Sequence, residues 1–360
     1  MQDLFAELLQ VALGARDSLS QAPTAKEWEA LYEESKRQAV AGIALEGVKK
    51  LPESQRPPRA LLFKWVGLSE KIVQRNKVMD QQTRTVWSQL KKDGLDAAIL
   101  KGQGIATLYG ALAPYRQSGD IDIWVKGGYR TVCDYVERTR PTEDVAYHRF
   151  HYDYFKDTEV ELHHRPTLMR NLMDDRRLAD WYNSFGAESF EYLEDKGFAV
   201  PPAAFNRIFI LTHIYRHFLF EGIGLRQVMD YYFVLKSQPA DVAEKEEAGK
   251  MLKTFRMTRF AKAMMWILNR LFGLEEKYLL CDMNEKEGRF VLSEIAQTGN
   301  FGSGDSRYKY QHFHKLRRQA AHGAHLLVHY PSEVVWTPIW LAYHKVWKWK
   351  KKREMRKSRQ

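Results

Sequence analysis

Residues 100–125 read LKGQGIATLYGALAPYRQSGDIDIWV, and residues 160–164 read VELHH. Apolar residues around these motifs predict short buried strands at 97–100, 121–125 and 158–163. Lys101-Gly102 predicts a turn before a helix over 105–112, and Gly127-Gly128 predicts the start of a helix running to about residue 140. Residues 147–163 alternate like a hairpin around 156–157. Together these segments predict a compact α/β block over residues 95–165.

The segments on both sides of this block have helical periodicity. Within the first 94 residues, the helical periodicity is found at the N-terminus and over 25–50 and 58–92, and Asp93-Gly94 predicts the end of the last of these helices. Beyond residue 173 we expect helices over 174–185, 202–220, 225–235, 243–271, 285–297, 308–325 and 331–352, and a glycine-rich loop over 300–305. The fold class is therefore α+β, with a helical region 1–94, a core 95–165 that we expect to hold a small mixed sheet, a helical region 166–344 and a basic tail 345–360.

Composition restricts the class of protein. With 360 residues, 44% hydrophobic and 13% aromatic, the chain can bury a large core. Two cysteines exclude a disulfide scaffold and a CxxC site, and they indicate a reducing compartment. We expect a cytoplasmic protein, because no secretory signal or membrane span is recognisable. Residues 345–360 hold nine Lys or Arg and one Glu, so the tail carries eight of the eleven net positive charges.

Three carboxylates are candidates for a metal site. Asp120 and Asp122 are two residues apart in a predicted strand, so they point to the same face. Like charges held side by side repel unless a cation lies between them, and carboxylate oxygens suit Mg²⁺. Glu161 and His163 share a face of their strand, which places Glu161 to supply the third carboxylate. A lone Asp-x-Asp is also typical of an exposed strand edge, but the apolar flanks favour a site.

The turn at Lys101-Gly102 is a candidate phosphate site, because a strand end followed by a helix start presents backbone N–H groups. Lys101 adds charge there. Other phosphate motifs fail: Thr107 replaces the third glycine of GxGxxG, and Asp305 replaces the lysine of a P-loop spacing that begins at Gly299. For this motif alone, an ordinary strand-to-helix turn stays open as the alternative.

Together the motifs resemble the nucleotidyltransferase superfamily related to DNA polymerase beta, with its hG[GS], Dh[DE]h and later h[DE]h signature. They are most similar to the bacterial family of uncharacterised nucleotidyltransferases, which shares a KG turn, an Arg before GDID and a later acidic-x-His. The matching residues here are Lys101-Gly102, Arg116, Gly119–Asp122, and Glu161 with His163; a weaker match adds Arg226 and Asp230. Two departures are Lys-Gly for the usual Gly-Ser or Gly-Gly, and Glu for the more frequent third Asp.

The resemblance implies an enzyme that moves an NMP from an NTP to an acceptor hydroxyl or phosphate and releases pyrophosphate. It implies two Mg²⁺ ions, with Asp120 and Asp122 holding the nucleotide-bound ion and Glu161 helping to hold the second and to activate the acceptor. It assigns the nucleotide to Lys101, Gly102, Arg116 and Gly119, and a substrate pocket to His163, Arg226 and Asp230. The acceptor and the preferred NTP stay open.

Two other features have alternative interpretations. His213 and His217 share a helix face, but without a third ligand a packed or surface face is favoured over zinc. Tryptophans and a polybasic run meet in the tail 345–360, which suits a membrane surface or a nucleic acid backbone; a docked terminal helix is the simpler interpretation. The runner-up function is therefore a non-catalytic or membrane-peripheral binding protein that retains the fold. An RNA-directed transferase is the third.

Overall fold

A four-stranded mixed sheet forms the centre of the computed structural model, which describes residues 2–302 and 325–358. The strand order is β1-β2-β4-β3, with β1 and β3 antiparallel to their neighbours and β2 parallel to β4. The bounds are β1 (Ala97–Ile99), β2 (Ile121–Val125), β3 (Arg149–His151) and β4 (Val160–His163). The small mixed sheet and the predicted α+β class are confirmed.

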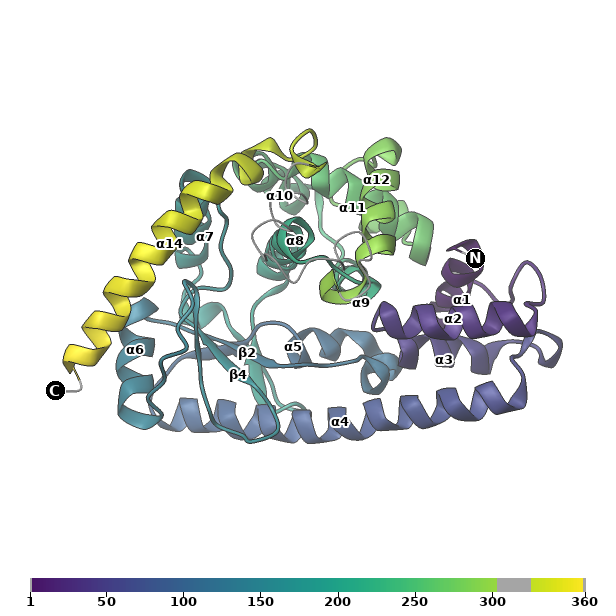
Figure 1. Cartoon of the computed structure of the whole chain (residues 1–360), viewed down its shortest axis with the longest axis horizontal. Coiled ribbons are helices and arrows are strands. Elements are labelled where there is room, and N and C mark those ends of the chain that lie inside the picture. Colours follow the sequence, from purple (N-terminus) through teal and green to yellow (C-terminus); the bar gives the residue numbers. More distant parts are fainter. Residues whose placement is uncertain (1, 303–324, 359–360) are drawn as a thin grey trace, which may run out of the picture.

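Alternation along β2 gives the sheet two different faces. Ile121, Ile123 and Val125 pack into an apolar cluster with α4 (Arg59–Lys92) and α6 (Gly128–Thr139). Asp122 and Trp124 face the other way, where Trp124 stacks on Phe205 of α8 (Ala203–Phe220) with ring centroids 5.0 Å apart. The sheet therefore lies between α4 and α8 (Figure 1), and the polar residues of the motifs face α8.

The long helix α4 connects the sheet with the N-terminal helices α1 (Gln2–Leu13), α2 (Ala25–Arg37) and α3 (Ala41–Lys50) and the short η1 (Glu53–Gln55). These helices lie over one end of α4, and α6 lies at the other end (Figure 1). Trp65 of α4 donates its Nε1–H to the carbonyl of Ala41, 2.8 Å away. The helix ends at Asp93 and Gly94, whose φ of +82° matches the predicted glycine stop.

The C-terminal half is helical, with α7 (Leu172–Asn183), α8, α9 (Leu225–Ser237), α10 (Val242–Thr254), α11 (Thr258–Phe272), α12 (Glu285–Thr298), α14 (Pro331–Ser358) and the short helices η3 (Ala187–Ser189), η4 (Glu276–Tyr278) and η5 (Asn300–Gly302). The single helix predicted over 243–271 is wrong, because the chain turns at Arg256, where φ is +56°. This turn buries both Phe255 and Met257.

Three further differences from the sequence prediction are local. The helix predicted over 105–112 is a four-residue α5 (Gln103–Ala106) followed by η2 (Thr107–Tyr115), which kinks at Gly110. A small second sheet, β5 (Glu191–Leu193) with β6 (Phe198–Val200), is too short to show periodicity. Of the predicted loop 300–305, residues 300–302 form η5; the rest of it, and all but residue 325 of the helix predicted over 308–325, lie outside the described residues.

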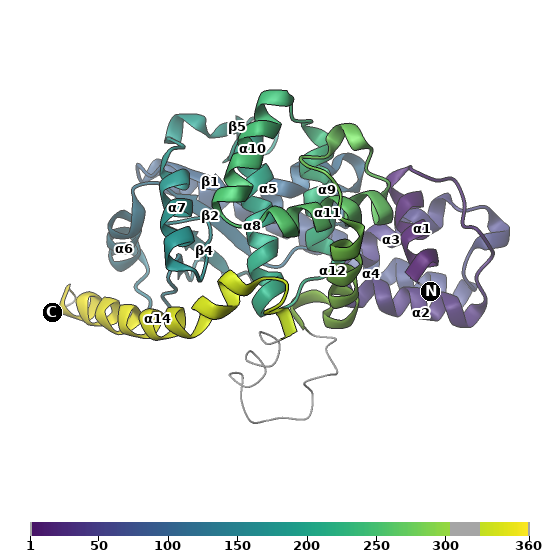
Figure 2. The ribbon, with the colours of Figure 1, turned by 90° about the horizontal axis from the view of Figure 1, so that it is seen from above.

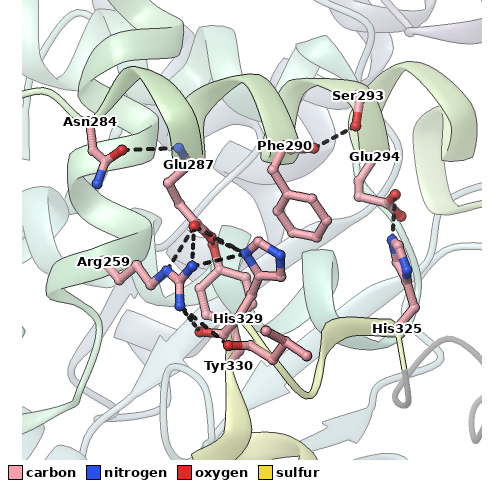
Figure 3. A network of polar contacts seen from close by, with 10 residues as sticks. Arg259, Asn284, Glu287, Phe290, Ser293, Glu294, His325, His329 and Tyr330 are labelled. Carbon is pink, nitrogen blue, oxygen red and sulfur yellow. Dashed lines mark hydrogen bonds and ion pairs between the residues drawn. The ribbon is translucent and has the colours of Figure 1, made fainter.

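The segment before α14 is fixed by a buried carboxylate (Figure 3). Glu287 of α12 accepts hydrogen bonds from Arg259 Nε at 2.7 Å and from Tyr330 Oη at 2.7 Å, and His329 Nδ1 lies 2.9 Å away. From there α14 runs along one edge of the molecule to the region of α6 (Figures 1 and 2). None of the described helices combines the length and apolar character that a membrane crossing needs.

Candidate active site

A cavity of about 190 Å³ lies between the polar face of the sheet and helices α8 and α9. Of the residues predicted from the sequence, it brings together Lys101, Gly102, Arg116, Asp120, Asp122, Glu161, Arg226 and Asp230. Gly119 is exposed and His163 is buried beneath the carboxylates, and neither lines the cavity. The motifs therefore meet in space at one place.

Sheet register sets the distance between the carboxylates. Asp122 of β2 is paired directly with Glu161 of β4. Asp122 Oδ1 lies 2.9 Å from Lys101 Nζ and 2.8 Å from His163 Nε2, and the same imidazole nitrogen lies 3.2 Å from Glu161 Oε2. Glu161 Oε1 also pairs with Arg149 Nη1 of β3 at 3.0 Å. Two buried acids are thus held by three cationic or titratable partners.

These partners decide the charge state of the pair. Burial disfavours the Asp122 anion, but Lys101 and His163 outweigh it, so the pKa of Asp122 is lowered. Burial and the neighbouring Asp122 raise the pKa of Glu161. Burial also opposes the charge on Lys101, yet Asp122, Asp120 and Glu161 raise its pKa, so it stays cationic at neutral pH. The site therefore combines an ionised acid with an acid that can take up a proton.

The donor set fits a divalent cation. Asp122, Glu161 and His163 each offer one ligand atom, and these atoms lie within 4.8 Å of one another. Asp122 Oδ2 is buried and accepts no hydrogen bond from the described residues, which leaves an oxygen for a metal. Asp120, at the start of β2, is half-buried and lines the same cavity. The geometry thus places His163 Nε2 beside the predicted ligand oxygens, and it makes Asp120 the more exposed of the two aspartates.

The sequence model of a family described as uncharacterised nucleotidyltransferases matches residues 24–273. The chain belongs to this family. No curated protein and no solved structure matches the chain. In this nucleotidyltransferase the matched segment contains every residue that lines the cavity, whereas α14 lies beyond it.

Arg116 and Asp230 form a clamp in this nucleotidyltransferase. Arg116 is 3% exposed and donates from Nε and Nη2 to the two oxygens of Asp230, at 2.7 and 2.8 Å. Tyr109 donates to the same carboxylate at 2.7 Å. Arg226 donates to the carbonyl of Gln117 at 3.0 Å. The clamp holds the segment before Asp120 against α9, so Arg116 has a positioning role besides the predicted contact with the nucleotide.

The turn at Gly102 matches a backbone requirement. Its φ is +52°, a region that L side chains rarely adopt, and a Cβ there would lie 3.3 Å from the carbonyl oxygen of Asp120. Glycine therefore permits the close approach between the turn after β1 and the backbone of Asp120. The helix that follows has only four residues, so the approach of backbone to ligand, rather than a helix dipole, is what the turn offers.

The sequence motifs assigned no part of this site to several polar residues that line the cavity, including His213 and His217, whose shared helix face we interpreted as packing or surface. Arg149 comes from β3 and His148 directly precedes that strand, and His213, Arg216 and His217 come from α8. Spacing was the available signal, because residues 213, 216 and 217 share one face of an otherwise apolar helix. Burial lowers the pKa of His148 and of His213, so both imidazoles are neutral at pH 7.

Proposed function

We propose that this chain is a Mg²⁺-dependent nucleotidyltransferase that moves an NMP from an NTP to an acceptor hydroxyl or phosphate and releases pyrophosphate. The observation that carries the proposal is the convergence of Asp120, Asp122 and Glu161 on one cavity beside Lys101 and Gly102. The family match supports nucleotidyl transfer in general. The metal, the nucleotide and the membership in the polymerase-beta-like superfamily are parts of the proposal.

Mg²⁺ bound by Asp120, Asp122 and Glu161 would supply the positive charge that an in-line displacement at the α-phosphate needs. Lys101 binds a phosphate oxygen of the donor, and its raised pKa keeps it charged. Glu161 takes the proton of the acceptor hydroxyl. The acceptor oxygen then bonds to the α-phosphorus, and the bond from that phosphorus to the oxygen bridging to the β-phosphate breaks, so pyrophosphate leaves with the bond electrons.

A thermal-shift series tests this function with wild type and Asp122→Asn, using each NTP with and without Mg²⁺. A ligand at about 100 times its Kd should stabilise the native state by roughly 2.7 kcal/mol. We expect one NTP to stabilise wild type only with Mg²⁺, and Asp122→Asn to lose the effect. Asp195→Asn, on an exposed turn, is the matched control and should respond like wild type. Mg²⁺-dependent binding that survives Asp122→Asn would sink the assignment.

The outer face of α14 favours a second function, attachment to an anionic membrane surface. Five large apolar side chains are exposed on this helix, namely Val335, Ile339, Tyr343, Val346 and Trp349. Their spacing of three or four residues puts them on one stripe, which runs into the lysines of 345–360. An apolar stripe with tryptophan and adjacent basic residues matches a helix that lies in a bilayer interface. The helix also packs on the body, because the rings of Trp340, Trp347 and Tyr343 itself make edge-to-face contacts with Tyr147.

Sedimentation with vesicles tests this attachment. We expect binding to phosphatidylcholine vesicles that contain phosphatidylglycerol, and little to phosphatidylcholine alone. The double variant Val346→Ser/Trp349→Ser should reduce binding, whereas Phe63→Ser, at a still more exposed apolar residue of α4, should not. Equal sedimentation of all three proteins, or none with either vesicle, would rule this function out. Capture of RNA that depends on the basic tail would favour the nucleic acid instead.

A further inference from the structure

Charged groups are ordered across the sheet in a way that the family motifs do not describe. Lys101 follows β1, Asp122 lies on β2, Glu161 on β4 and Arg149 on β3, in the spatial order of the strands. The cations therefore lie at the two edges and the acids between them. Neighbouring strands are about 4.8 Å apart, so the edge strands β1 and β3 are separated by roughly 14 Å.

A second guanidinium lies on the β3 side of the cavity. Arg216 Nη1 is 3.3 Å from Nε2 of His148, the residue before Arg149. Within the described residues, the nearest carboxylate oxygen to Arg216 is Glu221 Oε1 at 3.8 Å. Glu221 is itself held by His217 Nδ1 at 2.7 Å. Glu221 is thus shared between His217 and Arg216, and its contact with the guanidinium is the longer of the two.

This arrangement differs from that of Arg116 on the other side of the cavity. The Arg116 guanidinium forms a bidentate ion pair with Asp230, whereas Arg216 lines the cavity without such a pair. A largely buried guanidinium is costly unless it meets an anion at short range. Of the carboxylates on this side of the cavity, Glu161 pairs with Arg149 at 3.0 Å and Glu221 is held at 2.7 Å by His217. The cavity is therefore built to receive a negative group at its β3 side.

We propose that Arg149 and Arg216 bind a phosphate monoester on the acceptor, so that the acceptor is a phosphorylated small molecule. This inference rests on the proposed nucleotidyl transfer, in which the donor occupies the side of Lys101 and Gly102. The acceptor then enters from the β3 side and meets Glu161 between the two. Two planar guanidinium forks match the three oxygens of a phosphate better than the two of a carboxylate.

A binding experiment tests the site without a known acceptor. The protein is first saturated with Mg²⁺ and with the α,β-methylene analogue of whichever NTP stabilises it, and inorganic phosphate is then titrated in a calorimeter. We expect wild type to bind phosphate. Arg149→Gln and Arg216→Gln should each weaken that binding about tenfold, since one charge-assisted contact to phosphate contributes about 1.5 kcal/mol. Arg216→Gln, whose ion pair is with Glu221 and not with a proposed metal ligand, should leave the affinity for the nucleotide analogue within about twofold.

Controls separate this inference from the proposed function. Arg207→Gln lies on α8 outside the cavity and should bind phosphate like wild type. Arg216→Lys keeps the charge and should lose less than Arg216→Gln, which guards against a folding defect. If none of the nucleotide analogues binds, the result counts against the proposed function. Nucleotide binding without phosphate binding, equal binding of acetate, or loss of the nucleotide in Arg216→Gln would overturn the phosphate site alone.

Discussion

The Arg116–Asp230 clamp should be a major contribution to the stability of the fold. Both residues are at least nine-tenths buried, and their two contacts are 2.7 and 2.8 Å long. In Arg116→Met the Asp230 carboxylate stays buried and loses both contacts to the guanidinium, while it keeps the hydrogen bond from the Tyr109 hydroxyl. Asp230→Asn keeps an acceptor for Tyr109 but leaves the guanidinium without its anion. Removing one partner of a buried ion pair costs about 3–5 kcal/mol, so each variant should lose that much.

A double-mutant cycle in urea measures the clamp. In Arg116→Met/Asp230→Asn no buried charge is left unpaired, so the double variant should lose less than the sum of the single variants. The expected coupling energy is about 2–3 kcal/mol. The dependence of the unfolding free energy on urea should stay unchanged, because the same surface is exposed on unfolding. If each single variant loses less than about 1 kcal/mol of unfolding free energy, or if the losses of the two single variants add up in the double variant, the structural role of the clamp is refuted.

Three further outcomes follow from particular contacts. Gly102→Ala and Gly94→Ala both place alanine at positive φ and should each lose about 1–2 kcal/mol, but only Gly102→Ala, whose Cβ meets the carbonyl of Asp120, should lose Mg²⁺-dependent NTP binding in a titration. Burial raises the pKa of Glu333 to about 7 from 4.5, so between these pH values Glu333 is ionised in the unfolded chain and protonated in the folded one. The free energy of unfolding of wild type should therefore fall by about 3 kcal/mol relative to that of Glu333→Gln as the pH rises from 4.5 to 7. Urea unfolding at each pH measures this difference. Glu287→Gln weakens the anchor of Arg259 and Tyr330 and should cost about 2 kcal/mol in the same assay, and an unchanged midpoint would contradict that role.

Local patterns predicted the strands that carry the chemistry. Residues 121–125 form β2 within the bounds expected from their alternation, and the hairpin over 147–163 is present with shorter strands. Asp122 and Glu161 are adjacent because parallel pairing in register brings them together, and the period-two pattern of each strand fixes the face. The two sequence motifs were therefore sufficient to predict that Asp122 and Glu161 lie side by side on one face of the sheet.

The remaining features depend on contacts distant in sequence. Arg216 lies on the cavity because α8 crosses the polar face of the sheet, and no local pattern reports that crossing. The break at Arg256 follows from burial of Phe255 and Met257, which a continuous helical pattern hides. The proposed division at 95 and 166 stays a prediction. These are packing effects that override local propensity.

Arg116 and Arg216 should give opposite results, although both are arginines that line one cavity. Arg116→Gln should lower the unfolding free energy by several kcal/mol, because it breaks two short contacts to a buried acid. Arg216→Gln should stay within about 1 kcal/mol of wild type, because its nearest carboxylate oxygen is 3.8 Å away. Its loss should instead be in phosphate affinity. A stable Arg116→Gln, or a strongly destabilised Arg216→Gln, would show that contact distance does not separate positioning from binding in this cavity.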